Sequence, residues 1–281
     1  MSTTKVEFIT LPGVPLIWPG DDLAKIIIEC LAHENLKFED GDVLALAQKI
    51  VSKSEGQLVN LDEVQPSARA LELAPLVGKD PRHVEVILRE SKEVIWASPG
   101  IFVVETHHGF VCANAGVDRS NIEQNRNKGQ EKENQASLTT SNEWLCLLPR
   151  DPNRSAALLR AQIKALTGAE IAVLINDTHG RPFRMGGVGV AIGSAGLAAL
   201  VDQRGEPDMF GYTLQATLVG LGDELASAAS LMMGQAAEAT PAVLIRGLSY
   251  RRPDSARPDP GASELVRPKD KDVFRYPAHR D

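Results

Sequence analysis

The stretch IAVLINDTHGRPFRMGGVG, residues 171–189, constrains the fold of this chain more than any other. It opens with five apolar residues, three of them β-branched, and this length and branching predict a buried strand rather than a helix. Asp177 and Thr178 follow the apolar run and offer oxygens that suit a hard cation. Arg181 and Arg184 come next, and either side chain can bind phosphate or carboxylate. The alternative is an ordinary strand end followed by a glycine-rich turn.

The composition narrows the class of protein. Apolar residues make up 43% of the 281 residues, which is enough for a packed core in one large domain or two smaller ones. The net charge of −7, with scattered Lys and Arg, argues against a nucleic-acid surface. Three cysteines without CxxC or metal-ligand spacing fit a reducing compartment. The N-terminus has no apolar signal core and no run reaches about 18 apolar residues, so we expect a cytoplasmic protein without a membrane span.

Periodicity and turn residues predict the remaining elements. Strands are expected at residues 6–10, 43–47, 93–97, 101–106, 110–113 and 242–246. Helices are expected after Asp21 or Asp22 and at 67–77, 80–91, 155–166 and 223–233, and residues 188–201 are expected to form a strand and then a helix. Neither GxGxxG nor GxxxxGK(S/T) occurs, so the sequence predicts neither a Rossmann nor a P-loop nucleotide site.

Two polar segments stand outside this pattern. Residues 122–143 are rich in Asn, Gln, Glu and Lys, and we interpret them as a mobile insertion that is either a lid over a site or a plain surface loop. Residues 249–281 form a C-terminal tail whose first part, rich in Pro, Arg and Asp, is interpreted as a flexible connector.

Charged side chains lie near several expected strand ends. Lys49 and Lys53 belong to residues 48–56, which we interpret as a strand-to-loop exit that either faces an anionic ligand or is simply solvated. Asp118 follows a strand much as Asp177 does. Two such carboxylates that meet in space would bind a divalent metal, whereas each alone would be a turn residue.

His107 and His108 form an adjacent histidine pair. Neighbouring residues of a strand point to opposite faces, so these two side chains cannot easily share one ion. We therefore interpret them as part of a hairpin turn rather than as a metal site.

Several segments fall together, in order, between residues 6 and 248: Gly13-Val14-Pro15-Leu16-Ile17, Gly20-Asp21-Asp22-Leu23, Glu39-Asp40-Gly41-Asp42-Val43-Leu44, Val51-Ser52-Lys53-Ser54-Glu55-Gly56, Asn114-Ala115-Gly116-Val117-Asp118-Arg119-Ser120-Asn121, Asp177-Thr178-His179-Gly180-Arg181-Pro182-Phe183-Arg184, Asp223-Glu224, Leu231-Met232-Met233-Gly234-Gln235 and Pro241-Ala242-Val243. In this set and order the chain resembles the coenzyme F-420-0:L-glutamate ligases, the GTP-dependent γ-glutamyl ligases of the deazaflavin coenzyme pathway. Each segment alone is a weak signal, and the whole set in register is specific.

The resemblance implies an α+β fold of mixed β-sheets with flanking helices, neither Rossmann nor P-loop. Two intertwined subdomains would form one ligase domain over residues 1–248, and the protein would be a homodimer with its sites near the interface. The substrates would be F-420-0 and L-glutamate. GTP would phosphorylate a carboxylate of the coenzyme precursor, and the amine of glutamate would then displace phosphate from the acyl phosphate.

The resemblance also implies ligand-binding residues. The metal ligands of the family match Asp118, Asp177, Thr178 and Gln235, for two ions of Mg²⁺ or Mn²⁺, with K⁺ as a further candidate. Its GTP contacts match Val14, Pro15, Leu16, Ile17, Gln48, Lys49, Lys53, Asn121, Met233, Gly234, Gln235, Ala236, Ala237, Glu238, Ala239 and Thr240. Arg181 and Arg184 are candidate catalytic residues on chemical grounds alone, either screening phosphoryl oxygens or making structural ion pairs.

The chain departs from the family pattern at three places. Gln48-Lys49 stands where small hydroxyl residues often occur, residues 122–143 are longer than usual, and Gln235 stands where some members carry Glu. A neutral ligand in place of a carboxylate removes a charge from one metal site. Two other functions remain open, a related nucleotide-dependent amide ligase that acts on another acid and a non-catalytic regulator that binds GTP or metal.

Overall fold

The computed structural model describes residues 5–121, 144–254, 256–272 and 274–275, so the insertion expected at 122–143 lies outside the described residues. The chain divides into two compact units. Unit 1 comprises residues 1–16, 22–51 and 151–281, and unit 2 comprises residues 17–21 and 52–150. Each unit has its own hydrophobic core.

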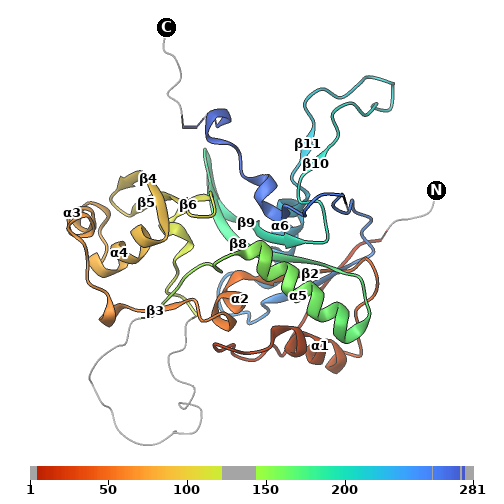
Figure 1. Ribbon diagram of the computed structural model, residues 1–281, viewed down its shortest axis with the longest axis horizontal. Coiled ribbons are helices and arrows are strands. Elements are labelled where there is room, and N and C mark those ends of the chain that lie inside the picture. Colours follow the sequence, from red (N-terminus) through yellow and green to blue (C-terminus); the bar gives the residue numbers. More distant parts are fainter. Residues whose placement is uncertain (1–4, 122–143, 255, 273, 276–281) are drawn as a thin grey trace, which may run out of the picture. The chain divides into compact units, whose positions relative to one another are not determined.

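Unit 1 is built on a five-stranded sheet in the order β1-β12-β2-β8-β9 (Figure 1). Its strands are β1 (Glu7–Thr10), β2 (Val43–Ala47), β8 (Ala172–Arg181), β9 (Arg184–Ala195) and β12 (Ala242–Arg246). The pair β2 and β8 is parallel and every other pair is antiparallel, which makes the sheet mixed. The carboxyl ends of β2 and β8 therefore lie at the same edge, and there Ala47 pairs with Asn176.

Helices cover both faces of this sheet. On one face, α6 (Leu221–Met233) packs its buried residues against alternate strand residues such as Val43, Leu174 and Val243. The residues between them, including Leu44, Val173 and Leu244, are also fully buried. Helix α5 (Pro152–Thr167) packs on β8 and β9, and α1 (Leu23–His33) packs on α5. Burial on both faces explains why these strands are continuous apolar runs without polar alternation.

Shorter elements complete unit 1. They are the two-stranded hairpin of β10 (Val201–Asp202) and β11 (Leu218–Val219), and the 3₁₀ turns η3 (Gly261–Leu265) and η4 (Lys269–Lys271). Helix α2 (Gln48–Ser54) follows β2, and the division between the two units falls within it. The guanidinium of Arg246 in β12 donates to both carboxylate oxygens of buried Asp42, at 2.9 and 2.7 Å, and joins the ends of two neighbouring strands.

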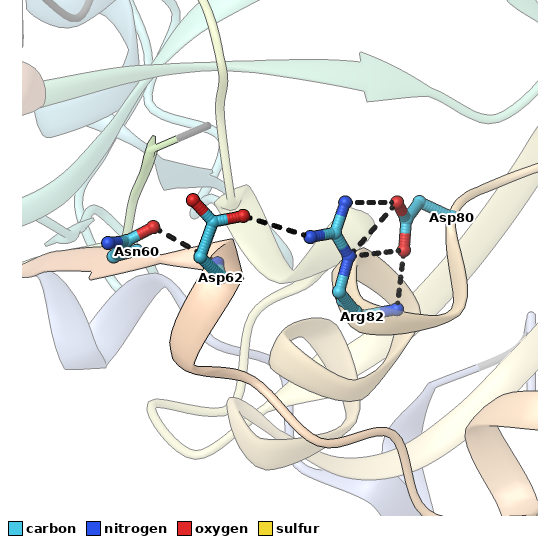
Figure 2. Close-up of polar contacts among 4 residues, drawn as sticks. All are labelled: Asn60, Asp62, Asp80 and Arg82. Carbon is cyan, nitrogen blue, oxygen red and sulfur yellow. Dashed lines mark hydrogen bonds and ion pairs between the residues drawn. The ribbon is translucent and has the colours of Figure 1, made fainter. Parts of the chain in front are cut away.

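Unit 2 packs two helices against a three-stranded sheet. The sheet is β4 (Ser91–Ser98), β5 (Ile101–Thr106) and β6 (Val111–Ala113), and the helices are α3 (Ala68–Val77) and α4 (Pro81–Arg89). A two-stranded sheet pairs β3 (Leu58–Asn60) with β7 (Trp144–Cys146), and the short turns are η1 (Leu61–Glu63) and η2 (Asn114–Gly116). Figure 2 shows how polar contacts tie η1 to α4, because Arg82 lies between Asp62 and the helix-capping residue Asp80.

The fold class expected from the sequence, α+β with mixed sheets and flanking helices, is confirmed. Most predicted strands and helices are present, with bounds that differ by a few residues. The cap at Asp22 of α1 is also confirmed, and α5 ends at Gly168, which has a left-handed backbone. Among the described helices, none is long and apolar enough to cross a membrane.

Three predictions about local structure are wrong. The strand-to-loop exit at 48–56 begins with helix α2, because Ile50 and Val51 are buried and the segment is too short for its helical period to be recognised. The strand at 171–175 continues to Arg181, because β9 supplies backbone partners to its polar residues. For the same reason the glycines at 186–189 lie within β9, and residues 188–201 contain no helix.

Candidate functional site

The polar half of β8 is the centre of the candidate site in unit 1. Asn176 and Thr178 lie on the face of β8 that α6 covers, because the side chains of a strand alternate between its faces. The amide nitrogen of Asn176 donates to the sulfur of Met233 at 3.6 Å, and the hydroxyl of Thr178 donates to Oε1 of Gln235 at 3.1 Å. The structure therefore brings together Thr178 and Gln235, two of the predicted metal ligands, from positions 57 residues apart.

Asp177 and His179 lie on the opposite face of the same strand. A carboxylate oxygen of Asp177 lies 3.1 Å from Nε2 of His179, and the two side chains are only 16% and 13% exposed. The carboxylate of Asp177 therefore has a hydrogen-bond partner on its own strand. Its carboxylate points away from the Thr178 side of the strand, so the predicted ligands of unit 1 form two groups.

Helix α6 approaches β9 closely at Gly189. A Cβ atom built on Gly189 would lie 2.4 Å from the carbonyl oxygen of Ala226 and 2.7 Å from Cβ of Ser230. The hydroxyl of Ser227 donates to the carbonyl oxygen of Gly189 at 2.7 Å. Since Gly189 is paired with Thr178 in the sheet, this contact positions the end of α6 beside Thr178.

The segment after α6 is held by its own hydrogen bonds. The hydroxyl of Thr240 donates to the carbonyl oxygen of Met233 at 3.0 Å, and the backbone N–H of Ala236 donates to the carboxylate of Glu238 at 2.7 Å. Gly234 adopts a φ of +73°, which ends the helix and turns the chain. Residues 233–240, predicted to contact GTP, thus form a compact turn at the end of α6.

Asp223, which carries part of the resemblance, lies in the first turn of α6. Burial raises the pKa of its carboxyl, although an oxygen accepts a hydrogen bond from the backbone N–H of Ala191 at 2.9 Å. The same contact ties α6 to β9 near the end of the helix opposite to Ser230. The structure therefore gives Asp223 a place in the packing of α6.

Arg181 and Arg184 flank the tip of the β8–β9 hairpin. Arg181 donates through Nη2 to the carbonyl oxygens of Met185 and Gly186, at 3.2 and 3.4 Å, which is a backbone contact rather than an ion pair. Its buried Nε has no hydrogen-bond partner among the described residues. Arg184 is exposed. Arg181 therefore supports the backbone of the hairpin, whereas Arg184 is open to solvent.

In unit 2, Asp118 and Asn121 belong to one short segment. The carboxylate of Asp118 accepts from the backbone N–H of Ser120 at 2.8 Å and from its hydroxyl at 3.1 Å. Lys53 donates through Nζ to the carbonyl oxygen of Asn121 at 2.6 Å, over 68 residues of sequence. Two residues predicted to contact GTP, Lys53 and Asn121, are thus in direct contact within unit 2.

The backbone before Asp118 is unusual. Asn114, Ala115 and Gly116 all have positive φ, between 54° and 69°, a conformation that costs free energy for residues other than glycine. Gly116 has no room for a side chain, because a Cβ atom there would lie 2.7 Å from the side chain of Leu148. This tight turn sets the direction in which the backbone continues toward Asp118.

The histidine pair is confirmed as part of a turn. His107 and His108 lie between β5 and β6, and their Nε2 atoms bond to backbone carbonyl oxygens of Arg89 and Pro149 at 2.9 and 3.0 Å. Both side chains therefore fasten neighbouring segments of unit 2.

The remaining predicted GTP contacts occupy the ends of elements. Gln48 is buried and Lys49 half-buried at the start of α2, directly after β2. Val14, Pro15 and Leu16 form the loop after β1 in unit 1, and Leu16 is 60% exposed. Ile17 is buried and belongs to unit 2.

The donor set suits a hard divalent cation. Within the described residues, no group of three or more His, Cys, Asp and Glu could hold a metal ion. The predicted ligands are instead two carboxylates, a hydroxyl and an amide, all oxygen donors of the kind that Mg²⁺ and Mn²⁺ accept. Two ligands at right angles, each about 2.1 Å from Mg²⁺, are about 3.0 Å apart, and the oxygens of Thr178 and Gln235 are separated by 3.1 Å. This pair fits neighbouring positions of one coordination shell.

Sequence reasoning missed Ser230 and Asn176. Nε2 of Gln235 donates to the hydroxyl oxygen of Ser230 at 2.9 Å. Asn176 is 5% exposed, and its Oδ1 has no hydrogen-bond partner among the described residues. Which serine of α6 faces Gln235 depends on how the helix lies on the sheet, so no local pattern in the sequence distinguishes Ser230.

Comparison with known proteins gives one consistent result. The family model described as F420-0:Gamma-glutamyl ligase matches residues 13–247, a range that contains every residue predicted to bind metal or nucleotide. A coenzyme F420:L-glutamate ligase of Methanothermobacter thermautotrophicus is 46% identical over 270 residues, which cover 96% of this chain and 99% of that protein. Proteins of the same name from Methanopyrus kandleri and Methanocaldococcus jannaschii are 46% identical over 275 residues and 42% over 271, covering 95% and 96% of this chain and 98% and 97% of those proteins.

Proposed function

Because the chain belongs to the F420-0:gamma-glutamyl ligase family, we propose that it is the ligase that adds L-glutamate to coenzyme F-420-0 through an amide bond. The observation that carries this proposal is the match to ligases of that name over nearly the full length of both chains. The product would be γ-linked glutamyl F-420. The oxygen-rich contacts at the end of β8 support a reaction that handles phosphate and metal.

The reaction would use GTP to activate a carboxylate. A carboxylate oxygen of the coenzyme precursor attacks the γ-phosphorus of GTP, the bond to the bridging oxygen breaks, and GDP leaves. The amine nitrogen of L-glutamate then attacks the acyl carbon, phosphate leaves, and the amine loses a proton. Such chemistry depends on positioning and on neutralising the phosphoryl oxygens more than on covalent help from the protein.

Asp118, Asp177, Thr178 and Gln235 would hold divalent cations. A bound Mg²⁺ or Mn²⁺ would neutralise charge on the phosphoryl oxygens. The fit of an all-oxygen donor set, and the spacing of the Thr178 and Gln235 oxygens, support this assignment. Before metal binds, Asp177 is held by His179 and Asp118 by Ser120, so each carboxylate has a fixed orientation.

Lys53 and the turn at residues 233–240 would bind the nucleotide. The hydrogen bond from Lys53 to the backbone carbonyl oxygen of Asn121 supports a shared role, because it holds the cationic side chain of Lys53 beside Asn121. Arg181 would contribute positive charge at the hairpin tip, where its guanidinium lies on the backbone of Met185 and Gly186. Arg184, exposed beside it, would act with Arg181.

A mass-spectrometric assay tests the function. The protein is incubated with F-420-0, L-glutamate, GTP and Mn²⁺ in KCl, and products heavier by one or more glutamyl units are expected. Parallel reactions omit GTP, replace GTP by ATP, add EDTA or replace KCl by NaCl. Product that depends on GTP and metal supports the proposal. Product with another acid only would favour a related amide ligase, and GTP binding without turnover on any acid would favour a regulator.

A further inference from the structure

The side-chain amide of Gln235 lies between two hydroxyl groups. Its Oε1 accepts from Thr178 at 3.1 Å, and its Nε2 donates to the oxygen of Ser230 at 2.9 Å. A primary amide has one acceptor end and one donor end, and in this arrangement the Thr178 hydroxyl donates to the first while the Ser230 hydroxyl accepts from the second. The carbonyl end is turned toward Thr178 on β8, and the NH₂ end is turned toward α6.

We propose that Ser230 is a positioning residue that keeps the carbonyl oxygen of Gln235 facing Thr178, so that both oxygens can bind one divalent cation. The inference rests on the proposed function, in which Thr178 and Gln235 are metal ligands. Only the oxygen end of an amide can bind a cation, because its N–H groups carry partial positive charge. An amide rotated by half a turn would present those N–H groups to the metal and would lose the interaction.

The position of Ser230 follows from the packing of α6. Ser230 lies three residues before the end of the helix, on the side that contacts β9. Because Gly189 has no side chain, the Cβ of Ser230 can approach the strand closely. The hydrogen bond from Ser227 to the carbonyl oxygen of Gly189 fixes the helix there. Gly189 is the sheet partner of Thr178, so Ser230, Gln235 and Thr178 are held by one packed junction.

This role is specific to glutamine at position 235. A carboxylate has oxygens at both ends, so a glutamate there would present an oxygen to the metal in either orientation. The hydroxyl of Ser230 would then no longer decide which atom faces Thr178. The inference therefore predicts that the effect of removing the Ser230 hydroxyl depends on whether residue 235 is Gln or Glu.

Titration of the full-length, nucleotide-free protein with Mn²⁺, followed by the electron paramagnetic resonance signal of free Mn²⁺, tests the proposal. Ser230→Ala is expected to weaken Mn²⁺ binding on the order of 10-fold, the loss typical of residues that orient metal ligands. Leu231→Ala is the control, because it shortens a neighbouring, 85% exposed side chain of the same helix and leaves both contacts of the Gln235 amide in place, and its affinity should equal that of the wild type. Circular dichroism and the Tm of each variant establish that the fold is kept.

The double variant Ser230→Ala/Gln235→Glu decides the mechanism. Its Mn²⁺ affinity should lie within about 2-fold of that of Gln235→Glu alone, because the carboxylate needs no orientation. A loss as large as that in the glutamine background would overturn the positioning role and leave only a packing role for Ser230.

The variant Gln235→Ala distinguishes the positioning role of Ser230 from the proposal that Gln235 is a metal ligand. If Gln235→Ala weakens Mn²⁺ binding and Ser230→Ala does not, the positioning role is wrong while the metal role of Gln235 stands. If Gln235→Ala leaves Mn²⁺ binding unchanged, the metal role of Gln235 is wrong and the positioning role falls with it.

Discussion

At the scale of single residues, the polar end of β8 separates its side chains by the alternation of the strand. Thr178 faces α6 and Gln235, whereas Asp177 faces the other way, toward His179. Two neighbouring residues of one regular strand can therefore direct their side chains toward two different ion positions. The carboxylate of Asp177 provides the one negative charge among the predicted metal ligands of unit 1, and that makes it the sharpest test of the site.

Asp177→Ala is expected to lower kcat/KM for glutamyl transfer by on the order of 100-fold or more, because the cation proposed to neutralise the phosphoryl oxygens would lose a charged ligand. The fold should be kept, since the side chain of Asp177 contacts only His179 of its own strand among the described hydrogen bonds and is not fully buried. Steady-state kinetics over a range of Mn²⁺ concentrations measure the effect. Glu29→Ala, at an exposed position of α1, is the control, and normal activity of folded Asp177→Ala would remove Asp177 from the metal site.

At the scale of elements, the junction of β8, β9 and α6 depends on the absence of a side chain at Gly189. The backbone of α6 lies so close to β9 that a single methyl group has no room. The same strand pair contains Gly180, where a Cβ atom would meet no other atom within 4 Å and the backbone φ is ordinary. The two glycines therefore form a matched pair.

Gly189→Ala is expected to destabilise the protein by about 1–3 kcal/mol, since the added methyl group must displace α6. Gly180→Ala should change stability by less than about 0.5 kcal/mol. Urea denaturation followed by circular dichroism measures both. Equal stability of the two variants would contradict the close packing of α6 on Gly189.

In unit 2, the ion pair that Arg82 makes with Asp80 predicts a dependence on pH (Figure 2). The contacts with Arg82 lower the pKa of the Asp80 carboxyl. A lowered folded-state pKa means that this stabilisation is fully present above the unfolded pKa, near 3.9, and is lost as the pH falls through the folded pKa.

Asp80→Asn keeps an oxygen that can cap α4 and removes the charge. Because the pair is about one-third exposed, the variant should lose only about 0.5–1 kcal/mol at pH 7. The difference from the wild type should disappear as the pH falls below 4. Urea denaturation at pH 7, 5, 4 and 3 provides the comparison, and a difference that is constant with pH would show that the charge of Asp80 does not stabilise the fold.

At the scale of the whole molecule, unit 1 exposes a group of large apolar side chains at the ends of two hairpins. Met209 and Phe210 are each 93% exposed between β10 and β11, and Phe183 and Met185 are more than 90% exposed at the β8–β9 hairpin. At the first tip, a carboxylate oxygen of Asp208 accepts hydrogen bonds from the N–H groups of Phe210 and Tyr212, both at 2.8 Å. Exposed apolar clusters of this kind commonly mark protein interfaces.

We propose that the protein is a homodimer, as the family resemblance implies, and that the hairpin tip with Met209 and Phe210 contributes to the interface. Size-exclusion chromatography with light scattering should give twice the 30.3 kDa of one chain. Met209→Ser/Phe210→Ser should shift the mass toward the monomer, because the proposed interface would lose two large apolar side chains. Leu71→Ser, at an exposed apolar residue of α3, is the control, and an unchanged dimer in the double variant would place the interface elsewhere.

The sequence by itself determined the elements whose signals are local. The apolar runs at residues 43–47 and 242–246, and the cap at Asp22, are properties of a few neighbouring residues, and the structure confirms them. The order of short motifs along the chain was also sufficient to indicate the family, because that order does not depend on how distant segments meet.

The tertiary structure alone decided where the polar end of β8 lies and what it contacts. The extension of β8 through Thr178 needs β9 as a backbone partner, and the bond from Thr178 to Gln235 joins residues 57 positions apart. Neither Ser230 nor Asn176 carries a local pattern that distinguishes it from other polar residues. Their roles arise because α6 packs against Gly189, and such contacts between distant segments depend on strand pairing and helix packing rather than on the propensity of any single stretch.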